Sequence, residues 1–188
     1  AETLLPQMAA KSRELTLMRF GRTTQLYAPI YLSNYCTNRC LYCGFSSDNR
    51  IRRRVLTIEE AEAEAFILLK RGFNHILLVT GEAEKVADTA YLEKIAKRLS
   101  PFFAAISIEV QPLSVQDYEC LFKAGITGVA VYQETYDREL YGRLHLGGKK
   151  KDYDFRLNTP VRAAQSGMRE IGIGALLGLS DWRAEGLA

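Results

Sequence analysis

Apolar and polar positions follow two different periods along this chain, and the two periods predict different elements. Short continuous apolar runs are typical of buried parallel strands, whereas apolar residues spaced three or four apart predict helices. The runs predict strands at residues 26–32, 76–79, 105–110, 128–132 and 170–176. The helical spacing covers residues 6–20, 57–71, 88–99, 114–124 and 160–166, and a further helix begins near residue 179. Thr57 followed by Glu60 predicts a capping box at the start of the second helix.

The regular alternation of strand and helix predicts an α/β fold with parallel strands covered by helices. Five strands are fewer than the eight of a closed (β/α) barrel, which typically needs about 250 residues. We therefore expect an incomplete parallel barrel that contains about the first five strands. The helix before the first strand predicts an N-terminal helical extension over residues 1–25, followed by the barrel part over residues 26–188.

Composition narrows the class of protein without identifying a function. The chain has 188 residues, 47% of them hydrophobic, and a formal net charge of +3, which is too small to argue for nucleic-acid binding. No apolar run approaches the length of a membrane span and no leader pattern is visible, so a soluble, cytoplasmic protein is expected. Two basic runs, at residues 50–54 and 149–151, are interpreted as solvated surface, with attraction of an anion near a site as the alternative.

The strongest chemical signal is a group of three cysteines. Cys36, Cys40 and Cys43 form a C-x3-C-x2-C pattern directly after the first predicted strand, whereas Cys120 lies alone in a predicted helix and is interpreted as a buried, inert thiol. Thiolates select zinc or iron–sulfur clusters. A structural zinc site needs four ligands, and only His75 and His145 could add to the three thiolates. A cubane cluster held by three thiolates would leave one iron open to a further ligand; a zinc site and an electron-transfer cluster remain alternatives.

The cysteine loop resembles that of the radical S-adenosylmethionine (SAM) superfamily. Residues 31–36, 43–46, 78–82, 109–112, 132–136 and 171–183 are further similar to the tyrosine lyases of thiazole biosynthesis, the 2-iminoacetate synthase family, and the similarity runs from about residue 4 to the end. The resemblance implies that Cys36, Cys40 and Cys43 hold a [4Fe–4S] cluster that cleaves SAM. It also implies a carbon–carbon lyase that breaks the Cα–Cβ bond of tyrosine to give 2-iminoacetate (dehydroglycine) and p-cresol. The implied partners are thiazole synthase and a reduced flavodoxin- or ferredoxin-type electron donor.

The resemblance also assigns cofactor-binding roles, each weighed against a purely structural one. It implies that Tyr42 packs near the adenine of SAM, that Gly81 and Glu82 meet its amino group, and that Arg156 meets its carboxylate. The remaining candidates for binding SAM are Glu109, Gln111, Glu134, Gly174 and Ala175. Glu109 and Gln111 are expected to share one face of a strand, because side chains alternate along it. His145 and Tyr136 are candidates for lining a tyrosine pocket.

Two other functions stay open at this point. The first is the tyrosine lyase of [FeFe]-hydrogenase maturation, although residues 179–183 favour the thiazole enzyme. The second is a non-catalytic module that binds zinc or an iron–sulfur cluster, which metal and sulfide analysis would distinguish. Residues 147–149 lack the full spacing of a phosphate-binding loop, and we exclude that interpretation.

Overall fold

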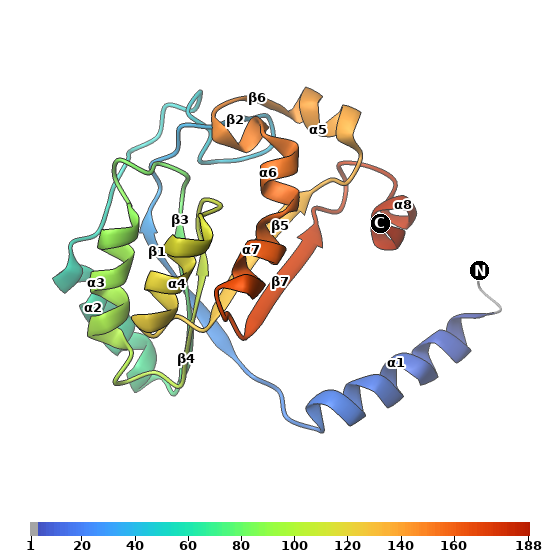
Figure 1. The fold of residues 1–188 in the computed structure, drawn as a ribbon, viewed down its shortest axis with the longest axis horizontal. Coiled ribbons are helices and arrows are strands. Elements are labelled where there is room, and N and C mark those ends of the chain that lie inside the picture. The colour runs from blue at the N-terminus through green and yellow to red at the C-terminus, as the bar shows by residue number, and fades with distance from the viewer. Residues whose placement is uncertain (1–3) are drawn as a thin grey trace.

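A five-stranded parallel sheet forms the centre of the molecule in the computed structural model, which describes residues 4–188. The strand order is β1-β3-β4-β5-β7, so neighbours in this sheet follow one another in chain order (Figure 1). The strands are β1 (Tyr27–Ser33), β3 (His75–Thr80), β4 (Ala105–Glu109), β5 (Gly128–Glu134) and β7 (Glu170–Ala175). All five strands predicted from the apolar runs are present, within a few residues of the expected bounds.

A second, two-stranded sheet was not predicted. It consists of β2 (Arg39–Cys40), inside the cysteine segment, and β6 (His145–Gly147), which pair antiparallel. Strands of two and three residues are too short to show a period-two pattern, so the sequence carries no signal for them. This small sheet joins two segments that lie about one hundred residues apart in the chain and places them over the same end of the large sheet (Figure 1).

Helices connect the strands of the large sheet, and one further helix precedes the first strand and another follows the last. They are α1 (Leu5–Phe20), α2 (Ile58–Lys70), α3 (Thr89–Leu99), α4 (Val115–Lys123), α5 (Arg138–Leu144), the 3-10 turn η2 (Lys149–Lys151), α6 (Tyr153–Leu157), α7 (Thr159–Gln165) and α8 (Trp182–Leu187). The predicted helices are all present, whereas the short α5 and α6 were not predicted. The predicted capping box at the start of α2 is confirmed, because the Thr57 hydroxyl accepts from the Glu60 amide at 3.1 Å while the Glu60 carboxylate accepts from the Thr57 amide at 2.8 Å.

One face of the sheet packs against helices α2, α3, α4 and α7 (Figure 1). The alternation along β4 illustrates how: Ile106 and Ile108 are buried on the helix side, while Ser107 and Glu109 lie on the other face. The core between sheet and helices is almost entirely aliphatic. Its most deeply buried aliphatic side chains are Leu32, Ile76, Leu78, Leu92, Ile95, Leu99, Ile106, Ile108, Leu121 and Ile126.

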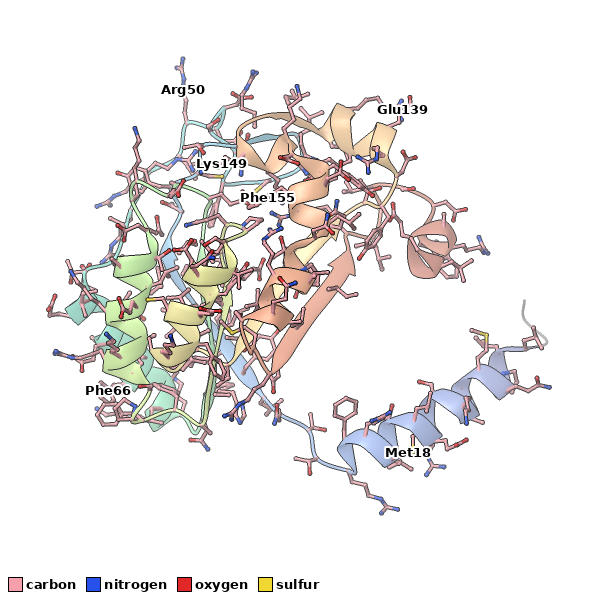
Figure 2. The ribbon with its side chains drawn as sticks, viewed as in Figure 1. Met18, Arg50, Phe66, Glu139, Lys149 and Phe155 are labelled. Carbon is pink, nitrogen blue, oxygen red and sulfur yellow. The ribbon has the colours of Figure 1, made fainter. Side chains whose placement is uncertain are left out.

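Helix α1 differs from the other helices because none of its residues is buried. It projects away from the sheet, and Met18 on it faces solvent (Figure 2). The division into an extension over residues 1–25 and a barrel part over residues 26–188 stays a prediction. Within residues 4–188, no helix combines the length and the apolar character needed to cross a membrane.

The carboxyl ends of the parallel strands all meet at one edge of the sheet, and the loops that follow them form one end of the molecule. The small sheet, α5 and α6 lie at this end, as the upper part of Figure 1 shows. Arg50 and Lys149 mark it in Figure 2, whereas Phe66 marks the opposite end. In open and closed parallel sheets, ligands bind at this carboxyl end. The fold therefore brings the cysteine segment to the place where a site is expected.

Candidate functional site

A cavity of about 340 Å³ opens at the carboxyl ends of β3, β4 and β5. It brings together nine of the predicted site residues, which are Cys36, Cys40, Tyr42, Cys43, Gly81, Glu82, Glu109, Glu134 and Arg156. Sequence reasoning did not identify the other eight residues of its wall, which are Tyr31, Asn38, Gly44, Phe45, Val79, Thr80, Val110 and Lys150. The cavity is large enough for a small ligand and is lined by both charged and aromatic groups.

The three clustered cysteines are free thiols on the wall of this cavity. Cys40 is buried, whereas Cys36 and Cys43 are partly exposed. Burial raises the pKa of the Cys40 thiol to about 11, and the nearby Lys150 ammonium opposes that rise. Thiols must lose their protons to bind a metal, so binding at this loop would release protons.

The donor set fits a cluster better than a single zinc ion. Within the part of the chain that the structure describes, no three His, Cys, Asp or Glu side chains converge to hold one metal ion. A cubane presents its irons at separate corners, so its thiolate ligands need not meet at one point. His145 cannot complete a zinc site as it stands, because both of its ring nitrogens are hydrogen-bonded inside the protein. Three thiolates without a fourth soft side chain in the cavity wall are the set that leaves one iron open.

Glu82 connects the cysteine loop to the end of β3. Its carbonyl accepts hydrogen bonds from both the amide and the hydroxyl of Thr37, at 3.0 Å each. Gly81 lies so close to this loop that a Cβ at its position would be 2.2 Å from the Tyr35 carbonyl oxygen. Only glycine fits there without displacing the segment that carries Cys36.

Asn38, between the first two cysteines, is buried, and both ends of its side-chain amide are hydrogen-bonded. Its amide nitrogen donates to the Glu82 carboxylate at 2.7 Å, and its amide oxygen accepts from the Lys150 backbone amide at 2.9 Å. Gly148 packs directly on Asn38 with a φ of +84°, so a side chain at this position would be strained as well as obstructed. Asn38 therefore holds the cysteine loop against two other parts of the cavity wall.

Arg156 forms a buried ion pair inside the cavity. Its Nη1 donates to Glu82 Oε1 at 2.7 Å, and its Nε donates to the Tyr132 carbonyl at 2.8 Å. The side chains are only 7% and 11% exposed. Burial alone would lower the pKa of Arg156, but the Glu82 carboxylate, together with Tyr141 and Glu134, outweighs that effect and raises it. The guanidinium is thus charged and fixed in direction, as expected of a group that binds a carboxylate.

A second ion pair lies across the cavity. Lys150 Nζ donates to Glu134 Oε1 at 2.7 Å, and the two side chains are 11% and 14% exposed. Glu134 has a φ of +71°, and it is the only non-glycine residue with a positive φ among residues 4–188. Such a conformation is strained and is common at functional sites. Burial and the Glu134 charge together raise the pKa of Glu109, so carboxylates are crowded on this side.

The interpretation of the basic run at residues 149–151 as solvated surface was wrong for Lys150. Lys149 and Lys151 are exposed, but Lys150 points into the cavity wall. The run at residues 50–54 is corrected in the same way at Arg53. Its guanidinium donates to the carbonyls of Asn34, Phe45, Ser46 and Asn49 at 2.6 to 3.2 Å, on both sides of the cysteines. No signal in the sequence separates these two residues from their exposed neighbours.

His145 is not exposed to a substrate pocket, contrary to one sequence interpretation. The ring is completely buried, and Nε2 lies 2.7 Å from the Tyr42 hydroxyl. Burial lowers the pKa of His145 to about 4, so the ring is neutral at physiological pH. Burial and the Glu134 charge raise the pKa of the Tyr42 phenol. Tyr136 is likewise absent from the residues that line the cavity, and its backbone amide donates to the Glu185 carboxylate at 2.8 Å.

Three predicted cofactor residues lie outside the cavity wall. Gln111 lines a neighbouring cavity of about 280 Å³, and its amide nitrogen donates to the Ala87 carbonyl at 2.9 Å. Gly174 and Ala175 lie at the end of β7, where they pair with β5. Their roles toward a cofactor stay predictions. Cys120 is partly exposed on α4, so the expectation of a buried thiol was wrong, although it lies apart from the site.

The chain is similar in sequence to known enzymes, and this similarity agrees with a site that carries three clustered cysteines. The profile of the radical SAM superfamily matches residues 30–188. The 2-iminoacetate synthase of Escherichia coli (strain K12) is 45% identical over 98% of this chain and 49% of its own length. The 3-methylornithine synthase of Methanosarcina barkeri (strain Fusaro) is 32% identical over 87% of the chain and 46% of its own length.

Among solved structures, the crystal structure of HydG, a maturase of the [FeFe]-hydrogenase, superposes with a TM-score of 0.91. It is 32% identical and covers 98% of this chain and 42% of its own. The chain thus spans about half the length of the curated relatives that it matches. The predicted α/β fold is confirmed, with five parallel strands in one sheet that correspond to part of a barrel.

Proposed function

Because this chain belongs to the radical SAM superfamily, we propose that it forms part of a lyase that cleaves the Cα–Cβ bond of tyrosine to 2-iminoacetate and p-cresol. The observation that carries the proposal is the convergence of three free cysteines and two buried ion pairs on one cavity. Thiolates suit an iron–sulfur cluster, and the paired charges suit the ammonium and carboxylate groups of an amino acid such as the methionyl part of SAM.

The cavity residues would each bind or orient part of this cofactor pair. Cys36, Cys40 and Cys43 would hold three irons of a [4Fe–4S] cluster and leave the fourth open. When bound, the reduced cluster would supply the electron that cleaves SAM and so starts radical chemistry on the substrate. In this proposal Arg156 would bind the carboxylate of SAM, and the Glu134 carboxylate would accept from an ammonium or hydroxyl group. Their burial as charged groups on the cavity wall supports these roles.

The substrate and the partners rest on the relatives. The 45% identity to a 2-iminoacetate synthase supports tyrosine as the substrate and the assembly of the thiamine thiazole as the purpose. The proposal includes thiazole synthase as the protein that consumes the imine, and a reduced flavodoxin- or ferredoxin-type protein as electron donor. It also includes a cytoplasmic setting, where thiols stay reduced and can hold a cluster.

The proposal is tested with the protein reconstituted with iron and sulfide in the absence of oxygen, reduced, and supplied with SAM and tyrosine. We expect about four irons with labile sulfide per chain, as one cubane requires, together with 5′-deoxyadenosine and p-cresol as products. The matched control is Cys36→Ala, which removes one ligand and should form neither product.

The other outcomes separate the alternatives. Formation of 5′-deoxyadenosine without p-cresol would keep the radical SAM chemistry and exclude tyrosine as substrate. One zinc without sulfide would exclude the enzyme in favour of a metal-binding module. A second cluster in the protein, seen as about eight irons per chain, would favour the hydrogenase-maturation lyase over the thiazole enzyme.

A further inference from the structure

Tyr42 lies between two cluster ligands, and its two ends meet different environments. The residue lines the cavity, whereas its hydroxyl is bonded to His145, which lies behind the cavity wall and is completely buried. The two rings meet edge to face, with centroids 5.6 Å apart and planes at 89°. A single hydrogen bond to a buried residue therefore constrains the aromatic ring that the loop presents to the cavity.

The direction of this hydrogen bond follows from the partner of the other ring nitrogen. His145 Nδ1 lies 2.8 Å from the Tyr141 carbonyl oxygen, which can only accept. Nδ1 must therefore carry the proton of the neutral ring, and Nε2 must present a lone pair. The Tyr42 hydroxyl consequently donates to His145 Nε2. The lone pair of this nitrogen is the only acceptor on the neutral imidazole ring.

His145 is itself held tightly on the side away from the cavity. It pairs with Cys40 across the small sheet, and its ring stacks on Tyr141 with centroids 3.9 Å apart. The Tyr141 hydroxyl donates to the Lys150 carbonyl at 2.5 Å. A continuous set of contacts thus runs from the cluster loop through two aromatic rings to the lysine that pairs with Glu134.

We infer that His145 is a positioning residue, which acts through the Tyr42 hydroxyl to fix the Tyr42 ring against the cysteine loop and so shapes the site that binds the cofactor. The inference rests on the proposed function, because it assigns the fixed ring to SAM binding. A free tyrosine at this position could rotate about its side-chain bonds, and part of the binding free energy would be spent in ordering it.

A double-mutant cycle tests the inference, with Tyr42→Phe, His145→Phe and the double variant in the reconstituted protein. The measured quantities are the Kd for SAM and the iron content. We expect each single change to weaken SAM binding about tenfold, as loss of a buried hydrogen bond does, while about four irons per chain are retained. The double variant should bind SAM about as weakly as either single variant, because both remove the same interaction.

His145→Gln is the matched control for packing. Its amide can accept from the Tyr42 hydroxyl and donate to the Tyr141 carbonyl, so SAM affinity should return to within about threefold of the original. Additive losses in the double variant would overturn the inference, because His145 would then act independently of the Tyr42 hydroxyl. A glutamine variant as weak as the phenylalanine variant would overturn it too.

A second measurement keeps this inference separate from the proposed function. The same cycle is measured by urea unfolding of the cluster-free protein, where the Tyr42–His145 pair should show a coupling that no cofactor contributes. If the original protein takes up no cluster or binds no SAM, the proposed function fails. The coupling in the cluster-free protein then still decides whether His145 holds Tyr42, and its absence would overturn the positioning role.

Discussion

The helix-covered body of the sheet and the rim at its carboxyl end are built by different interactions. In the body, aliphatic side chains such as Leu78 and Ile108 pack between strands and helices, and the close contacts are apolar. At the rim, the cysteine loop is held by polar groups outside it, namely Glu82 and Lys150 from distant parts of the chain and Arg53 from the segment that follows the cysteines. The body is therefore stabilised by the burial of apolar surface, and the rim by specific hydrogen bonds.

This difference has a consequence for mutation. Apolar packing is spread over many contacts and tolerates one change with a partial loss of stability. A buried polar network has few members, and the loss of one leaves a charged or polar partner without compensation. Changes in the body should therefore lower stability and leave the site intact, whereas changes in the rim should alter the site as well as stability.

The largest effect is expected from Cys43→Ser, which removes a proposed cluster ligand at the cavity wall. Residues that only support metal ligands already change activity about 10- to 100-fold, so loss of the ligand itself should exceed about 100-fold. We expect the iron content to collapse while the circular dichroism spectrum is retained. Iron analysis and formation of 5′-deoxyadenosine check this. Serine retaining the full iron content would show that Cys43 is not a ligand.

Glu82→Gln should be the most damaging change in the polar rim that leaves the cysteines in place. Glutamine can still accept from Arg156, but its NH2 group then faces the Asn38 amide donor. Removing one partner of a buried ion pair costs about 3–5 kcal/mol, and we expect a loss of about 4 kcal/mol in the free energy of unfolding. Urea unfolding and the Kd for SAM are the measurements.

Glu84→Gln is the matched control for Glu82→Gln. Glu84 lies two residues along the same loop, and its ion pair with Lys149 is exposed to solvent. Exposed pairs contribute little to stability, so this variant should unfold and bind SAM like the original protein. Equal effects at residues 82 and 84 would contradict the view that burial in the rim gives Glu82 its importance.

In the body of the sheet, Ile108→Ala should lower stability without changing the site. Ile108 is completely buried on β4, and truncation of a buried isoleucine costs about 2–5 kcal/mol, so we expect about 3 kcal/mol. The control is Ile173→Ala on β7, whose side chain is 62% exposed and should matter little. At a temperature where both variants are folded, the Kd for SAM should be unchanged. A weakened Kd in Ile108→Ala alone would show that body and rim are coupled.

The same contrast explains how much was predictable from the sequence. Ile76 and Leu78 belong to a short, continuous apolar run. Such a run predicts a buried strand whatever lies elsewhere in the chain, so the sheet was predicted. The cysteines were identified because their ligand chemistry depends on local spacing. Asn38 and Lys150 were not identified, and His145 was given a different role, because their hydrogen bonds join partners 44 to 112 residues apart that no local pattern indicates.

Within the rim, the smallest effect is expected from Arg53→Lys. The Arg53 guanidinium bonds four backbone carbonyls that flank the cysteines on both sides, and a lysine ammonium cannot reproduce this planar geometry. Some of these bonds can be retained by lysine, so we expect the half-life of the cluster under a chelator to fall only about three- to tenfold, corresponding to about 1 kcal/mol.

Arg52→Lys is the control for Arg53→Lys, because Arg52 is the exposed neighbour in the same basic run. Release of iron to the chelator is followed by absorbance for both variants and the original protein. Faster release from Arg53→Lys alone would assign the effect to the carbonyls that its guanidinium binds. Equal release from both variants would mean that the hydrogen bonds of the Arg53 guanidinium do not hold the loop. The loop would then owe its shape to the hydrogen bonds that join Thr37 and Asn38 to Glu82 at the end of β3.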